Sequence, residues 1–139
     1  MTSARNRSHW SRGQTFTEFA YVATAFLLFT TGVMMMGEAV LAYNSMTSAA
    51  DEAVRYAVAN GPNSPVPATT AQIQQIAINT APDVPLTASN VTVSWITDAN
   101  ISTRQDAKVI VSYDYPLKVP WMTKVTLHLT ATSQMMASQ

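Results

Sequence analysis

The run of residues from 19 to 37 contains no charged side chain. Its length of about 19 residues is close to what an α-helix needs to cross a bilayer. The threonines within it cost little, because their hydroxyls can bond back to carbonyl groups of the same helix. Arg5, Arg7 and Arg12 precede the run and Glu38 follows it, which favours a cytoplasmic N-terminus. The pattern predicts a basic cytoplasmic leader over residues 1–13 and a transmembrane helix over 14–37.

Beyond residue 37 the apolar positions thin into a stripe with helical spacing. Such spacing predicts that the helix continues outside the membrane as an amphipathic segment over residues 38–61. Asn60-Gly61-Pro62 supplies a stop signal, because proline cannot continue the hydrogen-bond ladder. The stripe comprises Val40, Tyr43, Thr47, Ala50, Val54 and Ala57.

Residues 62–139 read as a small α+β region. Thr69 and Gln72 form a capping box that opens a short helix over about 70–81. Alternating apolar residues then predict strands at about 90–97, 107–116 and 123–133. Alternation and short connections favour an antiparallel meander with one wet face, whose dry face packs against the amphipathic helix.

Charge and composition exclude several classes of protein. The chain has 8 basic and 8 acidic side chains, and without the three leader arginines 5 basic residues remain against 8 acidic ones. A nucleic-acid partner needs clustered lysine and arginine, so we expect none. The chain also has no cysteine, which excludes a disulfide framework and a thiolate nucleophile.

A cleaved secretory signal is the main alternative to the membrane helix. The apolar core of such a signal is only about 7 to 15 residues long and is followed closely by an A-x-A site. Here Ala57-Val58-Ala59 lies far beyond the apolar run. We therefore favour a permanent membrane segment.

The junction between the basic and apolar segments places a carboxylate, Glu18, at the edge of a hydrophobic helix. An ionisable group within hydrocarbon costs a few kcal/mol unless it is neutralised or paired, which favours a functional role. The alternative is an interfacial position in the first turn of the helix, where the helix dipole favours a negative charge. The residue type alone leaves both interpretations open.

The junction resembles that of the prepilins, in which a membrane peptidase cuts after a glycine and a glutamate is the fifth residue of the mature chain. The wider pattern resembles the TadE-like minor pilins, or pseudopilins, of the tight-adherence (Tad/Flp) pilus system, which are type IV pilin-like. The resemblance rests on Gly13 with Glu18-Phe19-Ala20, on Gly32 and Gly37, and on the stretch from Ala49 to Ala57. Two features depart from the family pattern: Ala23-Thr24-Ala25 replaces a frequent proline, and Asp51 replaces a basic or small residue.

The resemblance implies a pilin-like fold and a structural role in the assembly of an adhesive pilus. A prepilin peptidase would cleave after Gly13, and the new amine of Gln14 would pair with Glu18 of a packed subunit. Phe19, Gly32 and Gly37 would contribute to helix packing, and contact with lipid alone is the alternative for the apolar surface of the span. The implied partners are the peptidase, other pilin subunits and the pilus-assembly platform. The implied location is the bacterial inner membrane with a periplasmic C-terminal region, and entry into an extracellular pilus is left open.

An uncleaved single-span anchor that presents a periplasmic interaction domain within a secretion machine is the second hypothesis. A mature chain that starts at Gln14 would favour the pilin, and one that starts at Met1 would favour the anchor.

Side chains able to do chemistry are sparse. The two histidines are His9, in the leader, and His128, which strand phase places on the polar face. Asp98, Asp106 and Asp114 are spaced too widely for a calcium loop. We therefore expect no catalytic site, no cofactor and no metal, and we expect that the chain is not an enzyme.

One apolar segment remains between the last two predicted strands. Leu117, Val119 and Trp121 alternate with prolines there and form a possible contact surface for another subunit. Folding back onto the helix or the sheet edge is the alternative.

Overall fold

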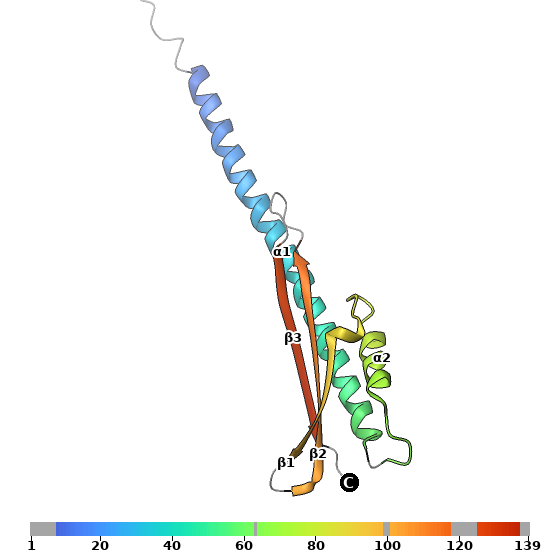
Figure 1. Cartoon of the computed structure of the whole chain (residues 1–139). Helices are drawn as coiled ribbons and strands as arrows, with labels where there is room; N and C mark the ends of the chain where they lie inside the picture. Colours follow the sequence, from blue (N-terminus) through green and yellow to red (C-terminus); the bar gives the residue numbers. More distant parts are fainter. Residues whose placement is uncertain (1–7, 63, 99–100, 118–124, 137–139) are drawn as a thin grey trace, which may run out of the picture. The chain divides into compact units, whose positions relative to one another are not determined.

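A computed structural model describes residues 8–62, 64–98, 101–117 and 125–136 (Figure 1). The chain divides into two compact units, Met1–Gly37 and Glu38–Gln139. The elements within the described ranges are α1 (Ser8–Ala59), α2 (Thr70–Thr80), the short 3₁₀ helix η1 (Ala88–Asn90), β1 (Val91–Asp98), β2 (Ile101–Leu117) and β3 (Val125–Met136). The predicted α+β class with a long apolar helix, one short helix and a small antiparallel sheet is confirmed.

The first unit consists of the N-terminal part of α1. The helix begins at Ser8, whereas the sequence predicted helix only from residue 14. The difference arises because no proline separates the leader from the apolar run, and a single interior glycine costs a helix only about 1 kcal/mol. The threonine hydroxyls bond back to their own helix, as expected: Thr24 donates to the Ala20 carbonyl at 2.8 Å and Thr31 to the Leu27 carbonyl at 2.8 Å.

The second unit contains a three-stranded meander of order β1-β2-β3, in which both pairs of strands are antiparallel. The register aligns apolar residues across the sheet: Val91 lies opposite Val111, and Val111 lies opposite Ala131. All three are buried. Because side chains alternate between the faces of a strand, this register gives the sheet one dry face, as predicted.

The dry face, α2 and the C-terminal part of α1 share one core. Most of the residues that α1 contributes are alanines, whose short side chains let the helix backbone lie close to its neighbours. The core cluster comprises Ala42, Met46, Ala49, Ala50, Ala53, Val54 and Ala57 of α1, Ile73, Ala77, Ala81, Val84 and Leu86 of α2 and the segment after it, and Val91, Ala107, Val109, Val111 and Ala131 of the sheet.

The buried face of α1 differs from the predicted stripe at its N-terminal end. Val40 is 52% exposed and Tyr43 is 43% exposed, whereas Ala39, Ala42 and Met46 are buried. The prediction followed helical spacing from Val40, but at this end the face that lies in the core is displaced by one residue, to Ala39, Ala42 and Met46. The two patterns agree further along, where Ala50, Val54 and Ala57 are fully buried.

The connections around α2 follow the local sequence. α1 ends at Ala59, next to the predicted stop signal. Thr69 and Gln72 form the predicted capping box of α2. The Gln74 side chain donates from Nε2 to the carbonyls of Ala88 at 3.1 Å and Val91 at 2.9 Å, which ties α2 to the start of the sheet.

Two strands are longer than the sequence predicted. β2 begins at Ile101 rather than at 107, and β3 continues to Met136 rather than ending at 133. Apolar alternation reports burial against a core, whereas strand pairing needs only backbone hydrogen bonds. The ladder therefore continues past the core, where the side chains are polar or, as at Met135 and Met136, exposed. The predicted start of β3 at 123 lies outside the described residues.

Candidate functional site at the start of the membrane helix

The predicted processing and assembly residues lie along one exposed stretch of α1. Gly13, Gln14 and Glu18 are all exposed. A Cβ added at Gly13 would meet no heavy atom within 4 Å. Nothing in the described monomer therefore requires glycine at position 13 on steric grounds. The interfacial interpretation places Glu18 in the first turn of the helix. In the full-length chain, however, Glu18 lies ten residues into a helix that begins at Ser8.

The peptide bond between Gly13 and Gln14 lies inside the helix. The Thr17 hydroxyl donates to the carbonyl of Gly13 at 2.8 Å and to that of Gln14 at 3.0 Å. A protease that cuts this bond must reach the Gly13 carbonyl, so the first turns of α1 have to open locally before cleavage. Sequence reasoning missed this constraint, because the helix was expected to start after the glycine.

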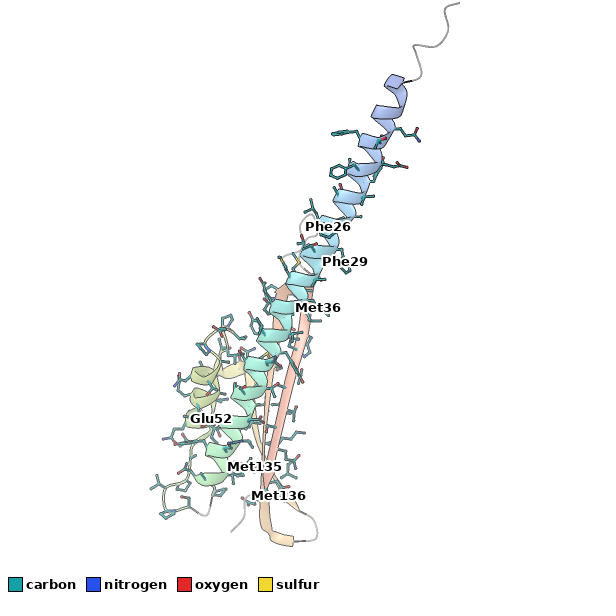
Figure 2. All side chains as sticks on the ribbon, turned by 180° about the vertical axis from the view of Figure 1, so that it is seen from behind. Phe26, Phe29, Met36, Glu52, Met135 and Met136 are labelled. Carbon is teal, nitrogen blue, oxygen red and sulfur yellow. The ribbon has the colours of Figure 1, made fainter. Side chains whose placement is uncertain are left out.

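Large apolar side chains form a ridge along the exposed surface of this unit. They recur alternately every three and four residues, so they share one face of the helix. Figure 2 shows three of them, Phe26, Phe29 and Met36, standing out from the helix. The aromatic ridge comprises Phe19, Val22, Phe26, Phe29, Val33 and Met36, each at least 56% exposed.

The opposite face of the same stretch carries small side chains among large ones, which include Leu27, Leu28 and Met35. Ala20, Thr24 and Thr31 lie about half a turn away from the aromatic ridge, at 100° of rotation per residue. Gly32 and Gly37, which the sequence assigned to assembly, also have open space around them, because a Cβ added at either would meet no heavy atom within 4 Å. Small residues interspersed among large ones allow neighbouring helices to approach closely.

Length and composition make α1 a candidate membrane span. The stretch Gly13–Ala59 is long and apolar enough to cross a bilayer, and its most apolar part is not covered by the rest of the described chain. The core helix of a soluble protein would be mostly buried, whereas the most apolar part of α1 is exposed.

The histidine and aspartate residues that the sequence analysis considered for chemistry do not form a common site in the described part of the chain. The His128 Nδ1 atom lies 2.6 Å from the Asp114 Oδ1 atom, and these side chains are 68% and 71% exposed. Strand phase predicted the exposed position of His128. Its pairing with Asp114 depends on the register of β2 and β3, which places the two residues directly opposite each other. Gln134 donates from Nε2 to the Asp106 Oδ2 atom at 3.3 Å. The side chains of His9 and Asp98 lie outside the described part of the chain.

Metal ligation finds no support in the described part of the chain, where no three histidine, aspartate or glutamate side chains gather in a group that could hold an ion.

The predicted contact surface in the β2–β3 connection is described only at its first residue. Leu117 is half-buried and closes β2, where it lies opposite Val125. Val119 and Trp121 lie outside the described residues.

Comparison with known proteins gives a family match in the N-terminal part of the chain. Searches of curated proteins and of solved structures each returned no match. The family model described as "TadE-like protein" matches residues 13–55, from the candidate cleavage glycine through the candidate span into the alanine-rich stretch. This family is pilus-associated and structural. Residues 13–55 are therefore a TadE-like segment, as their resemblance to that family predicted.

Proposed function

We propose that this chain is a minor pilin or pseudopilin that takes part in the assembly of a Tad-type adhesive pilus. It resides in the inner membrane with its N-terminus in the cytoplasm and Glu38–Gln139 in the periplasm. A prepilin peptidase cleaves it after Gly13. The observation that carries the proposal is the family match, which begins at Gly13 and includes both Glu18 and the apolar helix.

Cleavage would change the charge at the start of the span. It removes Arg5, Arg7 and Arg12 and leaves a free amine on Gln14. Glu18 is four residues further on, so its carboxylate lies on the same face of the helix as the new amine, about 6 Å along the axis. A carboxylate that enters a helix bundle needs a partner to offset its desolvation, and the amine of a neighbouring subunit can supply one.

The aromatic ridge and the small residues Ala20, Thr24 and Gly32 support helix packing as the mode of assembly. In lipid, association depends on close van der Waals contact rather than on the hydrophobic effect. Phe19 and Phe26 of one helix can fill the space beside Ala20, Thr24 or Gly32 of the next. Other pilins and the assembly platform, which belong to the same system, are the partners we propose for this surface.

An uncleaved anchor remains the second candidate, and one observation favours it. α1 runs without a break from Ser8 through the Gly13–Gln14 peptide, and the Thr17 hydroxyl bonds to both carbonyls there. An anchor that keeps its leader would use this continuous helix as it stands.

The mature N-terminus decides between the two candidates. The chain is expressed in cells whose prepilin peptidase cuts another prepilin of the same system, and the membrane-bound protein is analysed by intact mass and N-terminal sequencing. The wild type should start at Gln14. Gly13→Leu should retain residues 1–13, because the peptidase requires a residue without a side chain before the cut.

Gly37→Leu is the matched control. It makes the same chemical change at another helical glycine with open space around it, so it should be processed like the wild type. A wild-type chain that starts at Met1 beside an active peptidase would contradict the pilin proposal and support the anchor.

A further inference from the structure

The exposed face of α1 stays apolar beyond the end of the charge-free run. In the unit that begins at Glu38, Val40 is 52% exposed, Leu41 is 68% exposed and Tyr43 is 43% exposed. These side chains belong to the folded domain by position, yet they have the chemistry of a membrane helix. A domain surrounded by water on all sides would be expected to place polar groups there.

Polar side chains take over abruptly after Tyr43. The next exposed positions of the helix are polar or charged: Asn44, Ser48, Asp51, Glu52 and Arg55. The change from apolar to polar surface therefore falls between residues 43 and 44, whereas the boundary between the two compact units falls at Gly37 and Glu38. Six residues lie between the two boundaries.

The length of this stretch matches the thickness of a headgroup layer. At 1.5 Å per residue, Leu41 lies about 6 Å beyond Gly37 and Tyr43 about 9 Å beyond it. The headgroup region adds roughly 5 to 8 Å on each side of the hydrocarbon core. Tyrosine is enriched at this depth, because its ring is apolar and its hydroxyl can reach water.

The two acids that bracket the span fit the same register. Glu18 and Glu38 are 20 residues apart, which is about 30 Å of helix, the thickness of a hydrocarbon core. With both carboxylates at headgroup level, Leu41 and Tyr43 can lie only in the outer interface.

The sheet contributes apolar side chains at the same end of the domain. The end of β2 and the beginning of β3 lie toward the first turns of the helical segment of this unit (Figures 1 and 2). Leu117 and Val125, which face each other there, are half-buried and lie outside the core cluster.

From these observations we infer that Val40, Leu41 and Tyr43, together with Leu117 and Val125, form a membrane collar that lies in the headgroup layer of the periplasmic leaflet. The domain then rests on the bilayer surface before assembly, rather than standing away from it on a helical stalk. The inference relies on the membrane insertion contained in the proposed function, and it adds the depth at which the folded domain begins. Transfer into a filament would have to pull the collar out of the lipid.

Site-directed spin labelling measures this depth, and a chain without cysteine suits it well. Full-length single-cysteine variants Leu28→Cys, Leu41→Cys and Ser48→Cys are labelled with a nitroxide and placed singly in phosphatidylethanolamine–phosphatidylglycerol nanodiscs. All three positions are exposed, so a label fits without repacking the domain. Collision with oxygen, which concentrates in lipid, is compared with collision with a water-soluble nickel chelate.

Leu28 should report the hydrocarbon core, Leu41 the headgroup layer, and Ser48 bulk water about 10 Å further out. The nickel collision rate at Leu41 should be several-fold lower than at Ser48. Equal nickel rates at Leu41 and Ser48, with Leu28 still deep, would overturn the collar and leave the span intact. A water-exposed Leu28 would instead contradict the span itself, and dipolar broadening at Leu41 in nanodiscs holding two chains would assign the surface to protein contact.

Discussion

Replacing Glu18 with glutamine should abolish the association of this chain with partner pilins, while membrane insertion and cleavage after Gly13 continue. The substitution keeps the size of the side chain and removes its charge, so the partner amine would be buried without a counter-charge. Breaking a buried charge pair from one side costs about 3–5 kcal/mol, which corresponds to a loss of roughly a hundredfold to several-thousandfold in association. The measurement is the fraction of mature chain that co-purifies with the other pilins from solubilised membranes and from sheared filaments.

Glu38→Gln is the matched control. It makes the same chemical change at the other end of the charge-free run, where the carboxylate is exposed and, in the proposed register, at headgroup level. Its association should equal that of the wild type. If Glu18→Gln associates as well as Glu38→Gln does, the Glu18 carboxylate is an interfacial residue and the charge-pair account of assembly is wrong.

Ala53→Glu should unfold the unit Glu38–Gln139. Ala53 is fully buried in the core cluster shared by α1, α2 and the sheet. A carboxylate introduced there has no room, and no cation lies among the residues of that cluster. An unpaired buried charge is one of the few mechanisms that cost more than about 4 kcal/mol, which is a large part of the roughly 5–15 kcal/mol that stabilises a typical domain. Hydrogen exchange of β2, measured by mass spectrometry in nanodiscs, should lose its protection.

Ser48→Glu introduces the same side chain on the exposed face of the same helix. Surface substitutions of this kind usually change stability by less than about 0.5 kcal/mol, so protection of β2 should be retained. Retained protection in Ala53→Glu would mean that the alanine-rich face of α1 does not pack against the sheet.

The sequence predicted the order and type of the elements because each has a strong local cause. Charge-free length marks the span, the Thr69–Gln72 capping box opens α2, and alternation marks the strands. It did not predict how far β2 extends, because backbone pairing past the core leaves no apolar signature. It also assigned Val40 to the buried stripe, because helical spacing alone does not settle which residue of each turn faces the core, and here Ala39 and Ala42 do.

Some features of the candidate site could likewise be predicted from the sequence, and others could not. The spacing of Gly13 and Glu18 is local, so the sequence was sufficient to single out both residues. The bonds from the Thr17 hydroxyl to the Gly13 and Gln14 carbonyls depend on where the helix begins, which the sequence placed too late. The pairing of His128 with Asp114 depends on the register of two strands, and a single sequence does not contain that information.

The apolar surface beyond Glu38 was missed for another reason. The predicted span ended before Glu38, the first charged residue after the apolar run. A charge on one face of a helix does not exclude apolar residues on its other faces. Glu38 ends the charge-free run. Leu41 and Tyr43 nevertheless are exposed, so the outward surface of the helix remains apolar for another turn and a half. Only the structure separates the residues that face the core from those that face outward.

We expect residues 19–37 to cross the inner membrane with the following domain outside, and sidedness labelling distinguishes this topology from its alternatives. Phe16→Cys and Ser48→Cys, each the single cysteine of a full-length chain, are treated in intact spheroplasts with a maleimide that cannot cross membranes. Ser48→Cys should be labelled at once, and Phe16→Cys only after the membrane is disrupted. Labelling of both cysteines from outside, or recovery of the chain in the soluble fraction, would contradict the account.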